Sequence, residues 1–238
     1  MAGGVAKFQF ISFTLIVMGM VSGAFILYSI SYFAHVPPML CPSTEDPTVY
    51  VSCKAEDACK TSTWIIDKNS DENLHNWVKE MDLYCTGSFK MSLIGSMFFV
   101  GTFLGSFVLP RMADIYGRKP LFLIGLTLYI CVVVALFFAK SLALLYILMF
   151  LGGVAETGRY YVAYVYCVEM MPKDVQDKTG LFIFLVFGFA MTYIGLQFWF
   201  ITSNVYTNNW IALVLAILSW IMTFIWLPES PRFLFSHK

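Results

Sequence analysis

Two residues of opposite charge interrupt an apolar stretch that is long enough to cross a lipid bilayer. Glu156 and Arg159 lie three positions apart within the run Leu142–Val168, so they share one face of a helix. Ionisable groups at that depth are costly, and they usually neutralise each other or line a water-filled path. A charged solute could compete for either member, with Glu156 suiting a cation and Arg159 an anion. The same spacing also suits a purely structural ion pair, and the residues alone leave both interpretations open.

Several tyrosines follow this pair on the same stretch. They are Tyr160, Tyr161, Tyr164 and Tyr166. A tyrosine ring offers a π-face to a cation and a hydroxyl to a hydrogen-bonding solute. At about 3.6 residues per turn the four cannot share one cavity, so Tyr160 and Tyr164, which lie on one face, are the better candidates for a solute pathway. Tyr28 and Gln197, on other apolar stretches, are weaker candidates because such residues more often pack between helices.

Four of the six cysteines fall in one polar segment, residues 34–89. They are Cys41, Cys53, Cys59 and Cys85. In an oxidising compartment they predict two disulfides, for which three pairings exist. Free thiols and a zinc site are the alternatives, although the segment lacks the C-x-x-C spacing that is typical of zinc sites.

The sequence carries no recognisable catalytic motif. It has no phosphate-binding loop, no H-E-x-x-H zinc motif and no nucleophile elbow. The three histidines, His35, His75 and His237, are scattered along the chain, whereas catalysis needs convergent partners. We therefore expect no enzyme activity, no cofactor and no metal centre.

The composition indicates a protein that lies in lipid. Of 238 residues, 59% are hydrophobic and 13% are charged, and the mean hydropathy is +0.73. Soluble domains carry about 25% charged residues, so a soluble enzyme and a disordered scaffold are excluded. Fifteen basic residues balance fifteen acidic ones, which argues against a nucleic-acid partner and leaves membrane lipid as the expected one.

Six apolar stretches are long enough to cross the hydrocarbon core, which takes about 20 residues of helix. They are Phe8–Phe33, Met91–Leu109, Leu121–Ala139, Leu142–Val168, Leu181–Ser203 and Trp210–Leu227. Alternating strands of the outer-membrane type are missing from the sequence, so helices must satisfy the backbone. The prediction is an all-α polytopic membrane protein, with residues 1–238 forming one six-helix bundle and residues 34–89 an extramembrane loop.

The basic residues near the span ends predict the orientation of the bundle. Eight lie on one side, and they are Lys7, Arg111, Arg118, Lys119, Lys173, Lys178, Arg232 and Lys238. The short loops of the other side carry only Lys140. Positive residues favour the inner side, so we expect both termini there, with a cytoplasmic tail starting in residues 228–238.

Five segments, in order along the chain, resemble those of one transporter family. The connection Pro110–Lys119 resembles the signature D-R-x-G-R-[RK], and Pro228–Leu234 reads P-E-S-P-R-F-L. Glu169–Pro172 matches E-x-x-P, and Glu80–Cys85 and Ser96–Gly105 resemble the stretches at the second helix of organic ion transporters. The chain thus resembles the N-terminal six-helix half of the major facilitator superfamily, most of all its organic cation and anion transporters and the related sugar porters.

The resemblance implies a charge network at the inner ends of the helices. Its members would be Asp114, Arg118, Glu169, Glu229 and Arg232. In the family such groups latch helix ends in one conformation and release them in another, which a few kcal/mol of differential pairing allows. A permanent clamp is the alternative. Pro110 replaces a glycine of the family pattern, Ile115 a basic residue and Met149 an arginine, and these departures predict a weakened latch.

The family rocks two six-helix halves about a central site, and this sequence resembles one half. Three arrangements stay open: part of a full transporter, a half that pairs with a second copy or a separate half, and a non-transporting subunit of a larger membrane complex. For the first two, the resemblance implies facilitated diffusion or exchange of an organic ion or a sugar-like solute by alternating access. The membrane would be the plasma membrane, which suits disulfides, or an organelle membrane such as the mitochondrial inner membrane.

Overall fold

The computed structural model describes residues 7–43, 49–61, 63–67, 70, 74–202 and 204–236. Within them, six helical stretches are long and apolar enough to cross a membrane, which confirms the predicted all-α bundle of six spans. They are Lys7–Phe33, Ser88–Tyr116, Arg118–Leu136, Leu142–Glu169, Lys173–Phe200 and Tyr206–Phe235. Lys238, which contributed to the predicted orientation, lies outside the described residues, and the orientation stays a prediction.

The first span is interrupted twice. It consists of α1 (Lys7–Ser22), α2 (Ala24–Leu27) and α3 (Ile30–Phe33). At the first break the Gly23 N–H donates to the Met20 carbonyl at 3.4 Å, three residues back, in place of the α-helical bond four residues back. The break therefore releases backbone carbonyls inside the span, and other donors must satisfy them.

The fourth span changes its winding halfway along. It consists of α8 (Leu142–Glu156), the π-helical turn η1 (Thr157–Val162) and α9 (Ala163–Glu169). A π turn closes five residues back along the chain and is wider than an α turn, so it shifts the register of every side chain beyond it. The regular 3.6-residue period therefore does not hold across Thr157–Val162, and the prediction that Tyr160 and Tyr164 line a solute pathway stays a prediction.

The second span is longer than the predicted stretch Met91–Leu109, because α6 runs over Ser88–Tyr116. The connection that was expected to be a loop is helical through Pro110, and Gly117 alone separates α6 from α7 (Arg118–Leu136). Proline is tolerated in membrane helices because neighbouring groups re-satisfy the backbone that it frees. The second and third spans therefore meet in a single-residue turn.

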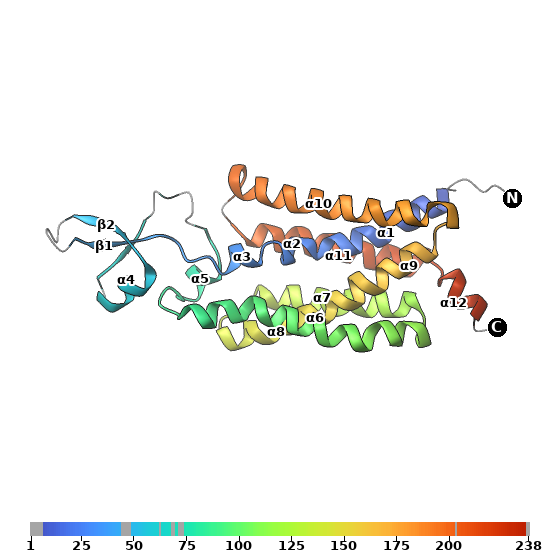
Figure 1. Ribbon diagram of the computed structural model, residues 1–238, viewed down its shortest axis with the longest axis horizontal. Helices are drawn as coiled ribbons and strands as arrows, with labels where there is room; N and C mark the ends of the chain where they lie inside the picture. The colour runs from blue at the N-terminus through green and yellow to red at the C-terminus, as the bar shows by residue number, and fades with distance from the viewer. Residues whose placement is uncertain are drawn as a thin grey trace.

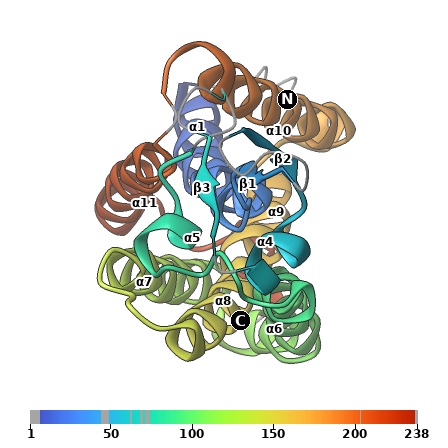
Figure 2. The same cartoon turned by 90° about the vertical axis from the view of Figure 1, so that its left-hand side faces the viewer.

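The remaining helices complete the bundle. They are the short turn η2 (Lys173–Val175), α10 (Gln176–Phe200), α11 (Tyr206–Trp226) and α12 (Pro231–Ser236). Helices α6, α7 and α8 form one group and α1, α10 and α11 a second, and α9 leads from the first group into the second (Figures 1 and 2). Helix α6 packs along α8, α1 along α11, and α7 against α8, η1 and α11.

Glycines allow the closest helix approach, between α6 and α8. A Cβ atom at Gly153 would overlap the Phe98 carbonyl oxygen, and one at Gly101 would overlap the Phe150 carbonyl oxygen. The hydroxyl of Thr157 also donates to the Thr102 carbonyl across this contact at 3.1 Å. Small residues that bring two backbones together are a common packing device in membrane helices.

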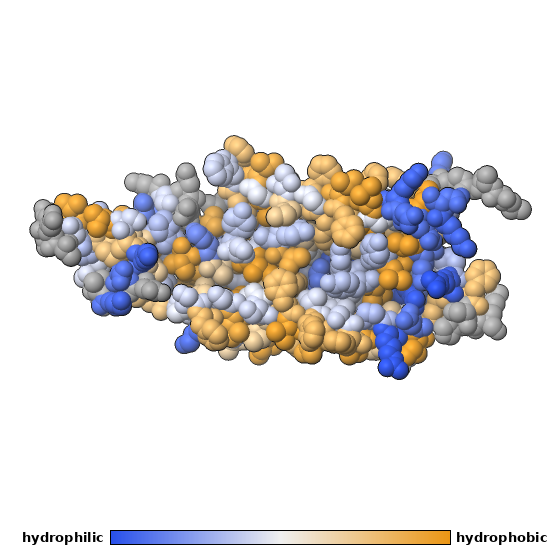
Figure 3. Space-filling view, viewed as in Figure 1, coloured by the Kyte–Doolittle hydropathy of each residue, from blue (hydrophilic) through white to orange (hydrophobic). Residues whose placement is uncertain are grey.

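The surface of the bundle is mostly apolar along its length. Figure 3 shows hydrophobic residues over the helices and a strongly hydrophilic zone at the end where α12 lies. The exposed apolar side chains include Phe99, Phe103 and Phe107 on α6 and Phe182, Phe184 and Phe189 on α10. This distribution suits a bundle surrounded by lipid.

The described part of residues 34–89 lies beyond the opposite end of the bundle (Figure 1). It holds a three-stranded antiparallel sheet of order β2-β1-β3, with β1 Met39–Pro42, β2 Tyr50–Cys53 and β3 Ile65–Ile66. Two short helices accompany the sheet, α4 (Ala55–Thr61) and α5 (Trp77–Glu80).

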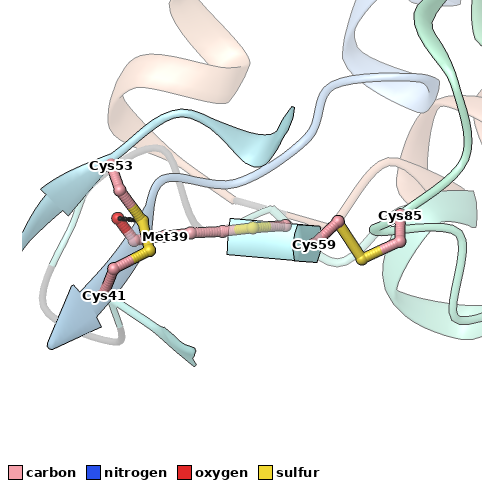
Figure 4. Close-up of a disulfide and its surroundings, with 5 residues drawn as sticks. All are labelled: Met39, Cys41, Cys53, Cys59 and Cys85. Atoms are coloured by element: carbon pink, nitrogen blue, oxygen red, sulfur yellow. Dashed lines mark hydrogen bonds between the residues drawn. A yellow bond between two sulfur atoms is a disulfide. The ribbon is translucent and has the colours of Figure 1, made fainter. Parts of the chain in front are cut away.

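Two disulfides tie this segment together. Cys41 of β1 pairs with Cys53 of β2, and Cys59 of α4 pairs with Cys85, three residues before α6 (Figure 4). All four cysteines singled out in the sequence are therefore used, and the second bridge fastens the segment to the start of a membrane span.

Candidate functional site

The helix-end charge network, defined as Asp114, Arg118, Glu169, Glu229 and Arg232, is centred on one arginine. The Arg118 guanidinium lies 2.6 Å from an Asp114 carboxylate oxygen and 3.3 Å from Glu169 Oε2, and it also donates to the Ala113 carbonyl at 2.7 Å. The Glu169 side chain is only 7% exposed, so its charge depends on this partner. Arg118 thus connects the end of α6 with the end of α9.

Glu229 joins the network through the backbone. Its carboxylate accepts the N–H of Arg118 at 2.9 Å and that of Lys119 at 3.1 Å, which caps the start of α7. Gly117, just before that helix, has φ +106°, and a Cβ atom there would lie 2.5 Å from Glu229 Oε2. Glycine therefore serves both the turn and the approach of the carboxylate.

The last turn of α11 and the segment after it are held by further polar contacts. The Lys119 ammonium donates to the Phe224 carbonyl at 3.2 Å, and the Tyr166 hydroxyl donates to the Pro228 carbonyl. Arg232, the fifth network member, is 82% exposed and lies 4.0 Å from Glu169, so its pairing is loose. The five predicted network residues lie at one end of the bundle. Asp114, Glu169 and the two arginines form ion pairs, whereas Glu229 accepts backbone N–H groups.

The pair Glu156 and Arg159 is buried in the middle of the bundle. The two side chains form an ion pair, and Glu156 is 6% exposed and Arg159 0%. Arg159 also donates to the carbonyls of Gly19 and Met20 at 2.9 and 2.5 Å, and its guanidinium lies 4.5 Å from the centre of the Tyr129 ring. In this conformation the pair contacts α1 and α7.

Four tyrosines form a second group, named here the tyrosine cluster: Tyr28, Tyr160, Tyr161 and Tyr164. Tyr28, Tyr160 and Tyr164 are partly buried and pack against the core of the bundle, and the Tyr160 ring meets the Phe187 ring edge to face at 4.9 Å. The rings of Tyr160 and Tyr161 meet edge to face at 5.3 Å, and Tyr161 is 47% exposed. Tyr161, which the sequence had not favoured as a pathway residue, contacts Tyr160 as its neighbour on the π turn.

Tyr166 and Gln197 do not join the tyrosine cluster. Tyr166 is buried away from the cluster, because its hydroxyl binds the Pro228 carbonyl. Gln197 is 1% exposed and does not line the cavity described next. Among the described residues its side-chain amide atoms have no hydrogen-bond partner.

A cavity of about 910 Å³ is lined by one member of the tyrosine cluster and by two members of the helix-end charge network. Tyr164 lines one part of it, and Glu169 and Arg232 line another. The other lining residues are Gln9, Val165, Val168, Met170, Met171, Pro172, Lys173, Asp174, Gln176 and Pro231. In the view of Figure 3, residues of intermediate hydropathy lie between apolar regions along the bundle.

The polar segment between the first two spans shows no sign of a metal centre in its described part. Across the described residues, no group of three or more His, Cys, Asp or Glu side chains could hold a metal ion. Beside the Cys59–Cys85 bridge, burial raises the pKa of Tyr84, and the nearby Asp82 carboxylate adds to the effect. Because the four cysteines of this segment form two disulfides, they serve as structural cross-links.

Comparison with known proteins gives a consistent result. A family model described as "Sugar (and other) transporter" matches residues 43–238. Organic cation transporter 1 of Caenorhabditis elegans is 29% identical over 170 residues, which is 70% of this chain and 28% of that protein. Solute carrier family 22 member 21 of Mus musculus is 32% identical over 181 residues, 73% of this chain and 30% of that protein.

A human relative shows the same pattern. Organic cation/carnitine transporter 2 of Homo sapiens is 29% identical over 176 residues, 71% of this chain and 30% of that protein. The matches to these three relatives therefore span less than a third of each relative's length. With six membrane spans, the helix-end charge network and a family match over most of its length, the chain belongs to the sugar (and other) transporter family of the major facilitator superfamily.

Proposed function

We propose that this chain forms one half of an alternating-access transporter for small organic cations, which works by facilitated diffusion or exchange. The observation that carries the proposal is the 910 Å³ cavity lined by Tyr164, one member of the tyrosine cluster. Aromatic faces attract organic cations by about 0.5–2 kcal/mol each, and phenol hydroxyls add hydrogen bonds. Several such rings can hold a cation without a fixed negative charge.

The buried ion pair supports a cation bound by rings. Glu156 is neutralised by Arg159, and the Arg159 guanidinium is engaged by a carboxylate, two carbonyls and an aromatic ring. Neither charge is therefore free to attract a solute in this conformation. The names of the relatives agree, since several are described as organic cation or organic cation/carnitine transporters.

The helix-end charge network would act as the latch of the cycle. Arg118 holds two carboxylates from different helices, and Arg232 reaches Glu169 only loosely, so a modest rearrangement could release one partner. Release at one end and closure at the other is what alternation between two conformations requires.

The second wall of the pathway would come from another six-helix half. That half could belong to the same polypeptide, to a second copy or to a separate protein, and we favour the same polypeptide because the relatives are about three times as long as the matched region. The two disulfides support placing residues 34–89 on an oxidising exterior, and hence the protein in a plasma membrane with its termini inside.

Uptake measurements test this proposal. The natural full-length polypeptide is expressed in cells, and uptake of radiolabelled tetraethylammonium is compared with that of cells lacking it. We expect saturable uptake, and we expect Tyr160→Ala and Tyr164→Ala each to weaken the apparent affinity about tenfold. Tyr50→Ala is the matched control, because Tyr50 lies in β2, far along the chain from both. Uptake equal to background, or unchanged in both cluster variants, would contradict the proposal.

A further inference from the structure

Arg159 is the one charged side chain with 0% exposure among the described residues, and its partners come from three helices. Besides Glu156 on its own span, it contacts α1 and the ring of Tyr129 on α7. A neutral ion pair would need only Glu156. The additional contacts show that the guanidinium also links its own span to α1 and α7.

The contacts with α1 fall at its first break. The Arg159 Nη1 group donates to the carbonyl oxygens of Gly19 and Met20 at 2.9 and 2.5 Å. The Gly19 carbonyl loses its α-helical donor there, because the Gly23 N–H turns to Met20. It accepts instead from the Ser22 hydroxyl at 2.7 Å and from Arg159, so Arg159 is one of two side chains that replace the backbone donor inside the span.

A second side chain supports the same break. The Tyr129 hydroxyl donates to the carbonyl of Ser22, the last residue of α1, at 2.8 Å. The space is shaped to match, since a Cβ atom at Gly23 would overlap the Arg159 guanidinium. Arg159 and Tyr129 are themselves stacked, so they form one unit beside the break.

The break decides where the rest of the first span points. Tyr28 follows Gly23 by five residues, just after α2, and it packs against the same core of the bundle as Tyr160 and Tyr164 of the tyrosine cluster. Tyr160 is the neighbour of Arg159 on the π turn. The π turn of the fourth span thus carries Tyr160, a member of the tyrosine cluster, next to Arg159. Arg159 in turn contacts the break in the first span that precedes Tyr28, another member of the cluster.

We infer that Arg159 is a positioning residue that stabilises the break of the first span at Gly23 and so places Tyr28 in the tyrosine cluster. The inference that the break depends on Arg159 stands on the contacts above. Only its consequence for solute binding rests on the proposed function.

Hydrogen exchange of the full-length protein tests the first part without any solute. In Arg159→Lys the charge stays, but a compact ammonium cannot donate to Glu156 and both carbonyls in the same geometry. We expect backbone amides of residues 19–28 to exchange at least tenfold faster, with those of residues 181–196 in α10 unchanged. Equal exchange in residues 19–28 would overturn the inference. If Arg159→Lys does not fold, Tyr129→Phe provides a milder test, because it removes only the hydrogen bond to the Ser22 carbonyl. We expect faster exchange in residues 19–28 of that variant, and unchanged exchange there would overturn the inference.

A double-mutant cycle tests the link to Tyr28. The dissociation constant for tetraethylammonium is measured for Arg159→Lys, Tyr28→Ala and the double variant. We expect each single change to weaken binding at least fivefold and the double variant to be no weaker than the weaker single one. The combination of Arg159→Lys with Tyr164→Ala is the control, and there the factors should multiply. Multiplying factors for the Tyr28 pair would overturn the link, whereas no binding by the unaltered protein would contradict the proposed function and leave the exchange result to decide the inference.

Discussion

The carboxylate of Glu229 caps a helix that begins 111 residues earlier in the chain, by accepting the backbone N–H of Arg118 at 2.9 Å. It also accepts the N–H of Lys119 and that of Ser230. A negative charge at a helix start is favourable because unpaired N–H groups and the helix dipole meet there. The end of the sixth span is thereby fastened to the start of the third.

Removing this cap should destabilise the bundle. We expect Glu229→Ala to lower the free energy of unfolding by about 1–2 kcal/mol, and Glu229→Gln, which keeps an acceptor but loses the charge, by roughly half as much. Thermal unfolding of the protein in detergent measures both. Equal stability of Glu229→Ala and the unaltered protein would show that the cap contributes little.

Gly117 should tolerate no side chain. Its φ of +106° is unfavourable for alanine, and the added Cβ atom would press against the Glu229 carboxylate. We expect Gly117→Ala to cost about 2 kcal/mol or more in unfolding free energy. Gly188→Ala is the matched control, because a Cβ atom there meets nothing within 4 Å among the described residues. Alanine is the better helix former, so this control should be neutral or stabilising, and similar losses in both variants would refute the prediction.

The pair Arg118 and Glu169 should be strongly coupled. Arg118→Ala leaves the Glu169 carboxylate buried without its main partner, and we expect a loss of about 3 kcal/mol in unfolding free energy. Adding Glu169→Gln to that variant should restore part of the loss, because the unpaired charge is then gone. Arg232→Ala serves as comparison and should change stability by less than about 0.5 kcal/mol, since that side chain is 82% exposed. Additive effects of the Arg118 and Glu169 changes would contradict the coupling.

The two disulfides should differ in the stability that they provide. Their sequence separations are 12 and 26 residues, for which loop closure predicts about 3 and about 3.5 kcal/mol. We expect the double variant Cys59→Ser with Cys85→Ser to loosen residues 55–85 more than the pair Cys41→Ser with Cys53→Ser loosens residues 39–53. Hydrogen exchange of these segments provides the measurement. The membrane spans should exchange as before, and a general loss of protection in the spans would show that the segment stabilises the bundle as a whole.

The amino-acid sequence by itself determined the parts of this protein that depend on local composition. Apolar stretches of about 20 residues predicted six spans, because a helix in lipid must be apolar over its length. The signatures around Arg118 and Glu229 predicted the family and the members of the helix-end charge network. The four cysteines of the polar segment were predicted to pair, although their spacing left three pairings open.

Only the tertiary structure decided how those residues are used. The π turn at Thr157–Val162 breaks the α-helical period of the fourth span, which the hydropathy of the sequence did not predict. Whether Glu229 would bind a guanidinium or a backbone N–H depended on how closely Gly117 lets two chain segments approach. The partners of Arg159 on α1 lie about 140 residues away, and such contacts arise from the meeting of helices, whereas hydropathy and spacing report only on each helix alone.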